Sequence, residues 1–349
     1  MTPTDRKSTI YDISRLSGAS PSTVSAALSG SWKSRRISEA TVETIRRIAA
    51  EQGYSTNMQA RGLRQARSGL VGMIIPLHDN RYFSSMSQSF EAEARDRGLM
   101  PVIASSMRDA REELRIVETL ISYAVESLFI AGATDPDAVT RQCRAAGMRH
   151  VFVDLPGKGA PSVISDNYEG ASILTRKLLS LQKPQDDPAR NRLFFLGGVA
   201  TTYATSRRIE AFRDTLTAAG LPPSDDQVIA CGYSPKSAMA ETAALMQRLG
   251  GLPAGLFINS VTAFEGVLGH FVHLPPKAFD ASVIGCYDYD PFATYLQFPV
   301  HMVRQDSHEL IAQAWQLLDR PPQDPVVIEV KPLLIPERTI YSGPFSDRG

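Results

Sequence analysis

The sequence predicts an α/β protein in which a small amino-terminal domain of three helices precedes two doubly wound parallel-sheet subdomains. Three observations support this fold class. A helix-turn-helix pattern occupies the first 30 residues, the charge balance changes near residue 68, and apolar strands alternate with amphipathic helices from residue 70 onward. A chain of 349 residues is long enough for two or three domains with full cores.

The first predicted helix covers residues 11–17, because Ile10, Ile13 and Leu16 recur at helical spacing. Gly18 is expected to end it, since glycine tolerates the backbone conformation that a tight turn requires. A second short helix directly after this turn would complete a helix-turn-helix.

That second helix has a good start, because Ser20 is a favourable N-cap and Pro21 can occupy a first helical position without its N–H. We expect Val24, Ala27 and Leu28 to face inward. The outer face would then be small and polar, which suits the DNA major groove. The alternative to a DNA-binding helix-turn-helix is an ordinary helical hairpin in a globular domain. The predicted outward residues are Ser22, Thr23, Ser25 and Ala26.

A third helix is expected after Ser38, with its apolar positions on one side and Gly53 as its end. Residues 1–68 hold 11 Lys+Arg against 5 Asp+Glu, a balance of +6, and the remaining residues hold 26 against 32, a balance of −6. A basic amino-terminal segment on an acidic body indicates a separate module that binds phosphates, although a solvated basic face would give the same count.

Six short motifs follow one another along the first 68 residues: Y-D-I-S at 11–14, S-G-A-S at 17–20, T-V-S at 23–25, S-x-x-T-V at 38–42, G-Y at 53–54 and N-x-x-A-R-x-L-R-x-x-R-S at 57–68. In this order and at this spacing, they resemble the lactose-repressor family of bacterial transcription regulators. The loop at residues 30–36 is similar to that of the subgroup containing the fructose repressors.

The resemblance implies that residues 1–54 form a DNA-binding headpiece and that residues 55–69 form a hinge. The hinge is expected to become helical only on DNA, where Leu63 would wedge into the minor groove. Packing of Leu63 against the headpiece is the alternative. The expected DNA-binding residues are Tyr11, Ser20, Pro21, Ser22, Thr23, Ser25, Ala26, Lys33, Arg35, Arg36, Asn57, Ala60, Arg61, Leu63 and Arg64.

The body alternates strands and helices, and most of its strands read as continuous apolar runs, which is typical of parallel sheets covered on both faces. A break in the rhythm near Asp166 divides the strands into two sets. The predicted strands are 70–77, 100–106, 127–133, 150–155, 162–167, 193–198, 227–233, 255–260 and 282–288.

The family implies a body of periplasmic-binding-protein type whose two subdomains are each discontinuous. Its expected bounds are 70–341, with a first subdomain of 70–165 and 302–324, a second of 166–301 and 325–341, and a tail at 342–349.

Ligands of open α/β sheets bind beyond the carboxyl ends of the strands, so the expected effector site lies between the two subdomains. The sequence departs from the family at three places. Ser260-Val261 stands where the family has Asn-Asp, Asp154-Leu155 where it has Asp-Arg, and Thr56 where the hinge has proline. The expected effector-binding residues are Tyr82, Phe83, Asp154, Thr202, Arg208, Ser260 and Asp288, among which Arg208 can bond carboxylates, phosphates or vicinal hydroxyls.

The sequence favours neither an enzyme nor a membrane protein. It has no Walker A loop, no G-x-S-x-G elbow and no H-E-x-x-H, and it has no apolar run long enough to cross a membrane. Cys143, Cys231 and Cys286 lack metal spacing and are typical of buried thiols in a reducing cytoplasm. We therefore expect no metal, no cofactor and a cytoplasmic location.

The combined expectation is a sequence-specific transcription regulator, in this family usually a repressor. It would bind a palindromic operator as a homodimer and respond to a small metabolite, with sugars and sugar phosphates favoured. The alternatives are a sensor of another effector class, such as a nucleobase, or an activator.

Overall fold

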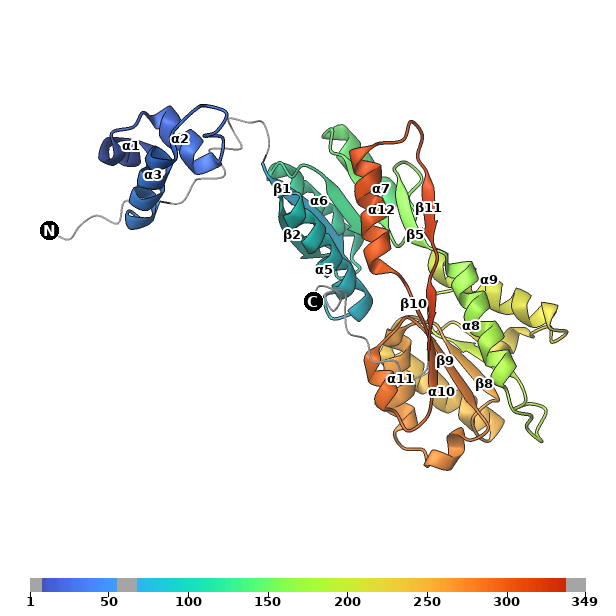
Figure 1. Ribbon diagram of the computed structural model, residues 1–349. Coiled ribbons are helices and arrows are strands. Elements are labelled where there is room, and N and C mark those ends of the chain that lie inside the picture. The colour runs from blue at the N-terminus through green and yellow to red at the C-terminus, as the bar shows by residue number, and fades with distance from the viewer. Residues whose placement is uncertain (1–7, 55–67, 337–349) are drawn as a thin grey trace. The chain divides into compact units, whose positions relative to one another are not determined.

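The structure is a computed structural model that describes residues 8–54 and 68–336, and the chain divides into two units at Gly69 and Leu70. Each unit has its own core. In the parts described, no helix is long and apolar enough to span a membrane. Figure 1 shows the all-helical first unit in blue and the two α/β subdomains of the second unit.

The first unit contains three short helices around one core, as the sequence predicted. Thr9, Ser20 and Ser38 each cap a helix by accepting a backbone N–H, and Gly18 ends the first helix with φ +68°. Ile13, Val24, Ala27, Val42 and Ile45 form the centre of the core. The helices are α1 (Ile10–Ser17), α2 (Pro21–Ser29) and α3 (Glu39–Glu51).

Two side chains of this unit lie where the sequence did not place them. Ala26 was expected to face out but is only 2% exposed, because α1 and α3 both pack against the short α2 and bury a wide arc of it. Leu16 shares the helical spacing of Ile13, yet it is 50% exposed, since the buried side of α1 is centred on Ile13. Helical spacing identified the helices but not the width of their buried faces.

The first subdomain of the body is a six-stranded sheet in the order β11-β5-β4-β3-β1-β2. All neighbouring strands in this sheet are parallel, and a helix therefore connects most strands that follow one another in the sequence. Its elements are β1 (Leu70–Ile75), α5 (Arg81–Asp96), β2 (Met100–Ser105), α6 (Ala110–Ser122), β3 (Leu128–Ala131), α7 (Pro136–Ala145), β4 (His150–Val153), β5 (Ser162–Ser165), α12 (Ser307–Asp319) and β11 (Val327–Val330).

The second subdomain repeats this order as β12-β10-β9-β8-β6-β7, with the difference that β12 runs antiparallel to β10. Its elements are α8 (Asn167–Leu181), β6 (Leu193–Leu196), α9 (Tyr203–Ala218), β7 (Val228–Ile229), α10 (Pro235–Leu249), β8 (Gly255–Ile258), α11 (Val261–Phe271), β9 (Val283–Tyr287), β10 (Val300–Arg304) and β12 (Leu333–Ile335), with three short 3₁₀ turns at Asp225–Gln227, Pro276–Phe279 and Pro291–Tyr295.

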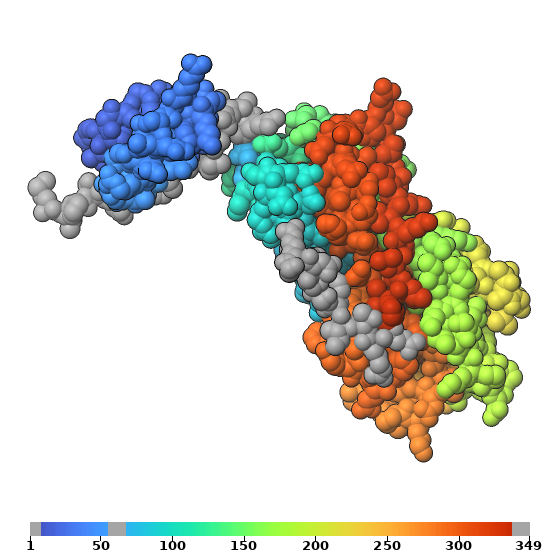
Figure 2. Space-filling model, in the orientation of Figure 1, coloured from blue at the N-terminus to red at the C-terminus, as the bar shows by residue number. Residues whose placement is uncertain are grey.

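The chain crosses between the subdomains after β5, after β10 and after β11. Helix α12 belongs to the first subdomain, where its Trp315 packs against Phe90 and Phe129. Figure 2 shows the orange-red surface of this helix beside the cyan surface of the start of the same subdomain. The expected boundaries at 302 and 325 were therefore wrong. Strand β10 lies inside the second sheet through Arg304, where it pairs with β9 and β12, and β11 pairs with β5 at the edge of the first sheet through Val330.

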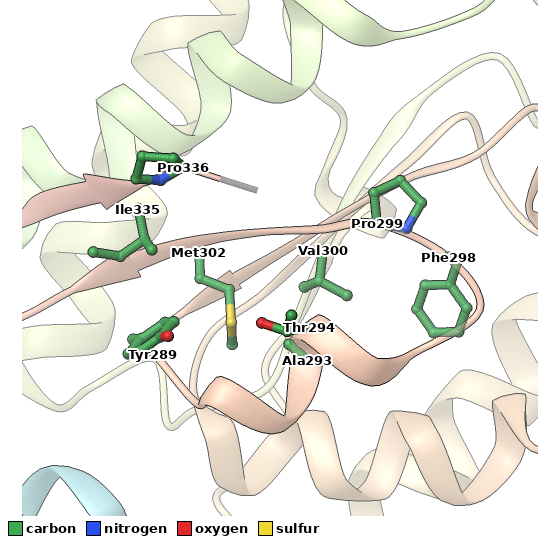
Figure 3. A pocket seen from close by; sticks show the side chains of 9 residues that line it. All are labelled: Tyr289, Ala293, Thr294, Phe298, Pro299, Val300, Met302, Ile335 and Pro336. Carbon is green, nitrogen blue, oxygen red and sulfur yellow. The ribbon is translucent and has the colours of Figure 1, made fainter. Parts of the chain in front are cut away.

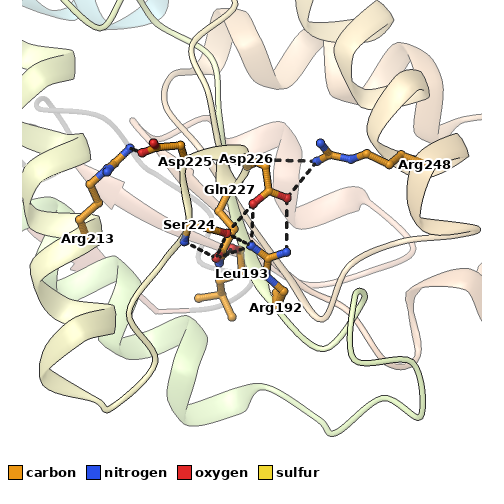
Figure 4. A network of polar contacts seen from close by, with 8 residues as sticks. All are labelled: Arg192, Leu193, Arg213, Ser224, Asp225, Asp226, Gln227 and Arg248. Carbon is orange, nitrogen blue, oxygen red and sulfur yellow. Dashed lines mark hydrogen bonds and ion pairs between the residues drawn. The ribbon is translucent and has the colours of Figure 1, made fainter.

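The amino-terminal end of the second sheet is closed by a network of exposed ion pairs (Figure 4). Arg192 bridges Asp226 at 2.8 Å, and Arg213 bridges Asp225 at 2.9 Å. The Gln227 amide donates to the Leu193 carbonyl at 2.7 Å and so joins the 3₁₀ turn to β6. This network lies at the starts of the strands, the edge opposite to the one where ligands of such sheets bind.

Two glycines of α11 provide a matched test of packing. A Cβ on Gly266 would lie 2.1 Å from the backbone oxygen of Pro235, whereas one on Gly269 would meet only the flexible Met239 side chain, whose sulfur lies 3.1 Å away. We expect Gly266→Ala to lower the free energy of unfolding by about 1–3 kcal/mol through overpacking. Gly269→Ala should be neutral or stabilising by up to about 1 kcal/mol, because alanine favours helices. Urea unfolding measures both, and equal effects of the two changes would contradict this packing.

Candidate DNA-binding and effector sites

The turn and the start of α2 present a cluster of hydroxyl groups. Pro21 and Ser22 are exposed, and the Ser20 hydroxyl lies 2.8 Å from those of both Ser22 and Thr23. Tyr11, on α1, is 71% exposed. Ser25 is half-buried, and Ala26 is buried and therefore supports the fold rather than contacting bases. These small donors and acceptors can meet base edges, but they offer few bidentate contacts.

The loop between α2 and α3 carries the exposed cations that the sequence assigned to phosphates. Trp32 packs against the headpiece core, and the Lys33 ammonium lies 5.3 Å from the centre of its ring. Arg35 and Arg36 are exposed, and Arg36 has φ +54°. The predicted hinge contacts lie outside the described residues; they are Asn57, Ala60, Arg61, Leu63 and Arg64.

In the body, the predicted effector site is centred on a buried arginine. Arg208 lies in the second turn of α9, not in the first as expected, and is 4% exposed. Its Nε donates to Asn167 Oδ1 at 2.8 Å, and its Nη1 donates to the Asn259 carbonyl oxygen at 2.6 Å. The guanidinium also stacks on the Tyr287 ring at 3.6 Å. Arg208 is therefore rigidly held inside the body and is not part of a surface salt bridge.

Two buried carboxylates face this cation from opposite subdomains. Asp154 directly follows β4 and Asp288 directly follows β9, the third strands of their respective sheets. Both residues have left-handed backbones, with φ +74° and +79°. Such conformations are strained for residues other than glycine and concentrate at functional sites. The structure thus supports these two aspartates as a symmetric pair around Arg208.

Burial of this cluster shifts the ionisation of its carboxyl groups. Burial raises the pKa of Asp154 to about 6, although the Arg208 charge and the Tyr82 hydroxyl, which donates to Asp154 Oδ1 at 3.1 Å, oppose the shift. Burial also raises the pKa of Asp288, opposed by Arg208 and by the Gln305 amide. The pKa of Tyr82 is raised well above its ordinary value by burial and by Asp154.

Polar and aromatic contacts join the subdomains around the cluster. Arg81 forms an ion pair with Asp290 at 3.1 Å, and the Asn80 amide donates to the Thr262 hydroxyl at 3.3 Å. The exposed Arg108 guanidinium lies 6.0 Å from the Phe83 ring centre in its own subdomain and 5.1 Å from that of Tyr233 in the other. These contacts close the two subdomains on each other beside Arg208.

The structure brings Tyr82, Phe83, Asp154, Arg208 and Asp288 together at this junction. Thr202 is the N-cap of α9, and its hydroxyl donates to the Val199 carbonyl.

Ser260 uses its hydroxyl to cap α11, and Asn259 is the residue that directly follows β8. The sequence-based register at this point was one residue late, since the strand ends at Ile258. Asn259, rather than Ser260, is therefore the first residue after this strand.

Four contributors were missed by the sequence analysis: Asn167, Asn259, Tyr287 and Gln305. Asn167 directly follows the break in rhythm near Asp166, whereas Gln305 lies at a crossing whose position the sequence placed only by resemblance. Among these four residues, only Asn259 had a local signal in the sequence, because it directly follows an apolar strand.

A hollow in the second subdomain is separate from this cluster (Figure 3). It lies beside β10 and β12, and no charged side chain is among its described lining residues, which are Tyr289, Ala293, Thr294, Phe298, Pro299, Val300, Met302, Ile335 and Pro336. The hollow shares no residue with the Arg208 cluster. It therefore does not correspond to the predicted effector site.

Comparisons with known proteins identify both units. Residues 9–57 match the model of bacterial regulatory proteins of the lacI family, and residues 71–274 match the periplasmic binding protein domain. The sucrose operon repressor of Klebsiella pneumoniae is 30% identical over 319 residues, which cover 90% of this chain and 92% of that protein. The chain belongs to the lacI family. It is thus a transcription regulator and not an enzyme.

Two further similar proteins extend this comparison. The ribitol operon repressor of Klebsiella aerogenes is 47% identical over 212 residues, covering 58% of this chain and 76% of that protein. The crystal structure of the lac repressor dimer bound to operator and the anti-inducer ONPF has a TM-score of 0.78 at 18% identity, covering 97% of this chain and 100% of that chain. The latter comparison supports the fold.

The loop cations of the headpiece give a test by salt dependence. Removing two phosphate contacts with Lys33→Gln and Arg35→Gln should make the slope of log affinity against log salt shallower by about 2 per headpiece. Arg47→Gln is the control for the loss of a single headpiece charge outside the loop, since Arg47 pairs with Glu51 on α3. Filter binding at several salt concentrations measures the slopes. An unchanged slope in the double variant would contradict the assignment.

The raised pKa of Asp154 gives a test by pH. Because folding raises this pKa from 3.8 to about 6, the stability gained from its protonated form is complete below pH 4 and is lost as the pH rises through about 6. Relative to Asp154→Asn, the wild type should therefore lose about 1–3 kcal/mol of unfolding free energy between pH 4 and 7. Urea unfolding at four pH values measures this difference. A difference that stays constant with pH contradicts the shift.

Proposed function

We propose that this lacI-family protein is a cytoplasmic repressor whose operator affinity is changed by a small polyhydroxylated metabolite bound at the Arg208 cluster. The observation that carries the proposal is the junction itself, where Arg208 and Asp288 of the second subdomain meet Asp154 and Tyr82 of the first. A ligand held there contacts both subdomains, so it can favour one relative position of the two over another.

The DNA partner is a palindromic operator, bound by a homodimer through two headpieces. Ser22 and Ser25 read base edges, and the loop cations hold phosphates. Residues 57–67 form a helix on the DNA, with Leu63 in the minor groove. The names of the ribitol and sucrose repressors support a sugar, sugar alcohol or sugar phosphate as effector.

Coupling between the two sites follows from the three crossings. A shift of one subdomain against the other turns about residues 166, 305–306 and 331–332, where the described chain passes between the sheets. In a dimer this shift changes the separation of the two hinge segments. The usual scale of such coupling is about 1–3 kcal/mol, or roughly 5- to 150-fold in operator affinity.

The test compares neighbouring arginines of α9. In the wild type, the effector is expected to change operator affinity by about 5- to 150-fold. Arg208→Ala should abolish this change and leave the effector-free operator affinity nearly unchanged. Arg207→Ala is the matched control, because Arg207 pairs with Glu210 on the same exposed helix face. Operator affinity of each variant is measured with and without the sugars and nucleobases that stabilise the protein against heat. A mutant that still responds like wild type would exclude Arg208 from the site.

A second outcome concerns the fold. If Arg208→Ala fails to bind operator even without effector, the arginine serves only to hold the subdomains in place. A response restricted to nucleobases, or operator binding that activates transcription, would favour the alternatives of another effector class or an activator.

A further inference from the structure

The junction holds a buried hydrogen-bond acceptor with a fixed orientation. Gln305 is 5% exposed, and its Nε2 donates to Asp288 Oδ1 at 2.5 Å. The amide thus presents its NH₂ group to Asp288, which leaves Oε1 as an acceptor. This Oε1 atom has no hydrogen-bond partner among the described residues. Buried acceptors without donors are rare in proteins and indicate a missing partner.

A second acceptor of the same kind lies beside Arg208. Asn259 is fully buried, its carbonyl oxygen accepts from Arg208, and its Oδ1 has no partner in the described part of the chain. Its Nδ2 donates to the Thr205 hydroxyl at 3.4 Å. Two unpaired amide oxygens and two carboxylates therefore belong to the same junction as one guanidinium, two of whose nitrogens already donate within the protein. The site has an excess of acceptors.

The charges and helix ends of the junction disfavour an anion. Two buried carboxylates outnumber the one buried guanidinium, so a phosphate would enter a site of net negative charge. Helix starts are the usual phosphate sites. Here Asn80, Asp166 and Ser260 fill the starts of α5, α8 and α11 with the chain's own oxygens.

Two features at the rim favour an anion instead. Arg108 is exposed beside Phe83 and Tyr233, and the start of α9 lacks a side-chain cap because Thr202 donates elsewhere. The Arg108 charge is solvent-exposed, so it attracts a phosphate less strongly than the buried carboxylates repel one. The buried carboxylates of the junction, rather than the exposed rim, therefore decide whether a neutral or an anionic ligand is preferred.

We propose that the effector is an uncharged polyol, a sugar or sugar alcohol whose hydroxyls donate to Gln305, Asn259 and the two aspartates, and that the site rejects phosphate esters of the same polyol. The inference rests on the proposed function, whose effector site it specifies. It separates this chain from regulators that respond to phosphorylated sugars.

The experiment uses the full chain and calorimetric titration at pH 7.5. The probes are ribitol, D-arabinitol, D-fructose and sucrose, the matched esters ribitol 5-phosphate and fructose 1-phosphate, and hypoxanthine as a nucleobase. We expect at least one neutral polyol to bind, and its phosphate ester to bind about 100-fold more weakly, because the ester buries uncompensated charge. Equal or tighter binding of an ester, or binding of hypoxanthine alone, would overturn the proposal.

Two variants test which residues set the preference. Asp288→Asn removes one carboxylate and should reduce the discrimination against the ester by about tenfold, since the site becomes less negative. Arg108→Gln should leave the affinity for the neutral polyol within about threefold, because its charge lies at the exposed rim. Discrimination that is unchanged in Asp288→Asn contradicts the charge argument.

Operator binding separates the two proposals. A neutral polyol that binds more tightly than its ester but leaves operator affinity unchanged supports the ligand preference of the site and contradicts the proposed function. An ester that binds and releases the operator supports the proposed function and contradicts the effector class. If no probe binds, the junction is not the effector site and both proposals fail.

Discussion

The body of this protein depends on one buried positive charge and its compensation. A guanidinium that is 4% exposed must be balanced by hydrogen bonds and opposite charges. Arg208 receives them from Asn167, Asn259 and Asp288 in its own subdomain and at the crossing, and from Asp154 across the junction. The balance of this charge is therefore coupled to the distance between the subdomains, which is the property that a switch between two global states requires.

The two sheets make this arrangement possible through their shared order. Because β4 and β9 occupy the same place in their sheets, the residues that follow them, Asp154 and Asp288, meet at the junction from opposite sides. Their left-handed backbones point to a functional role, since strain persists only where the surrounding structure enforces it. Ser165, Gln305 and Pro332 mark the crossings, so the hinge and the site share neighbours.

Much of this architecture follows from the sequence, and the failures have identifiable causes. Caps such as Ser20 and apolar runs such as residues 255–260 are local signals, and they located the helices and strands. The burial of Ala26 depends on two neighbouring helices, which helical spacing does not show.

The sequence located the site only in part. Arg208 and Asp288 were recognised from the family, whereas Gln305 and Asn167 were not, because their roles arise from crossings that join distant segments. Strands β11 and β12 are short edge strands, and their sheets could be assigned only from tertiary pairing.

The central claim is that the effector site and the DNA-binding headpiece belong to one coupled equilibrium. Thermodynamic linkage makes this coupling reciprocal for binding. The most direct measurement is the affinity for the identified effector in the presence and absence of saturating operator, compared with operator affinity in the presence and absence of saturating effector. The account predicts the same factor in both comparisons, within about 5- to 150-fold. Effector affinity that does not change when operator is bound would contradict it.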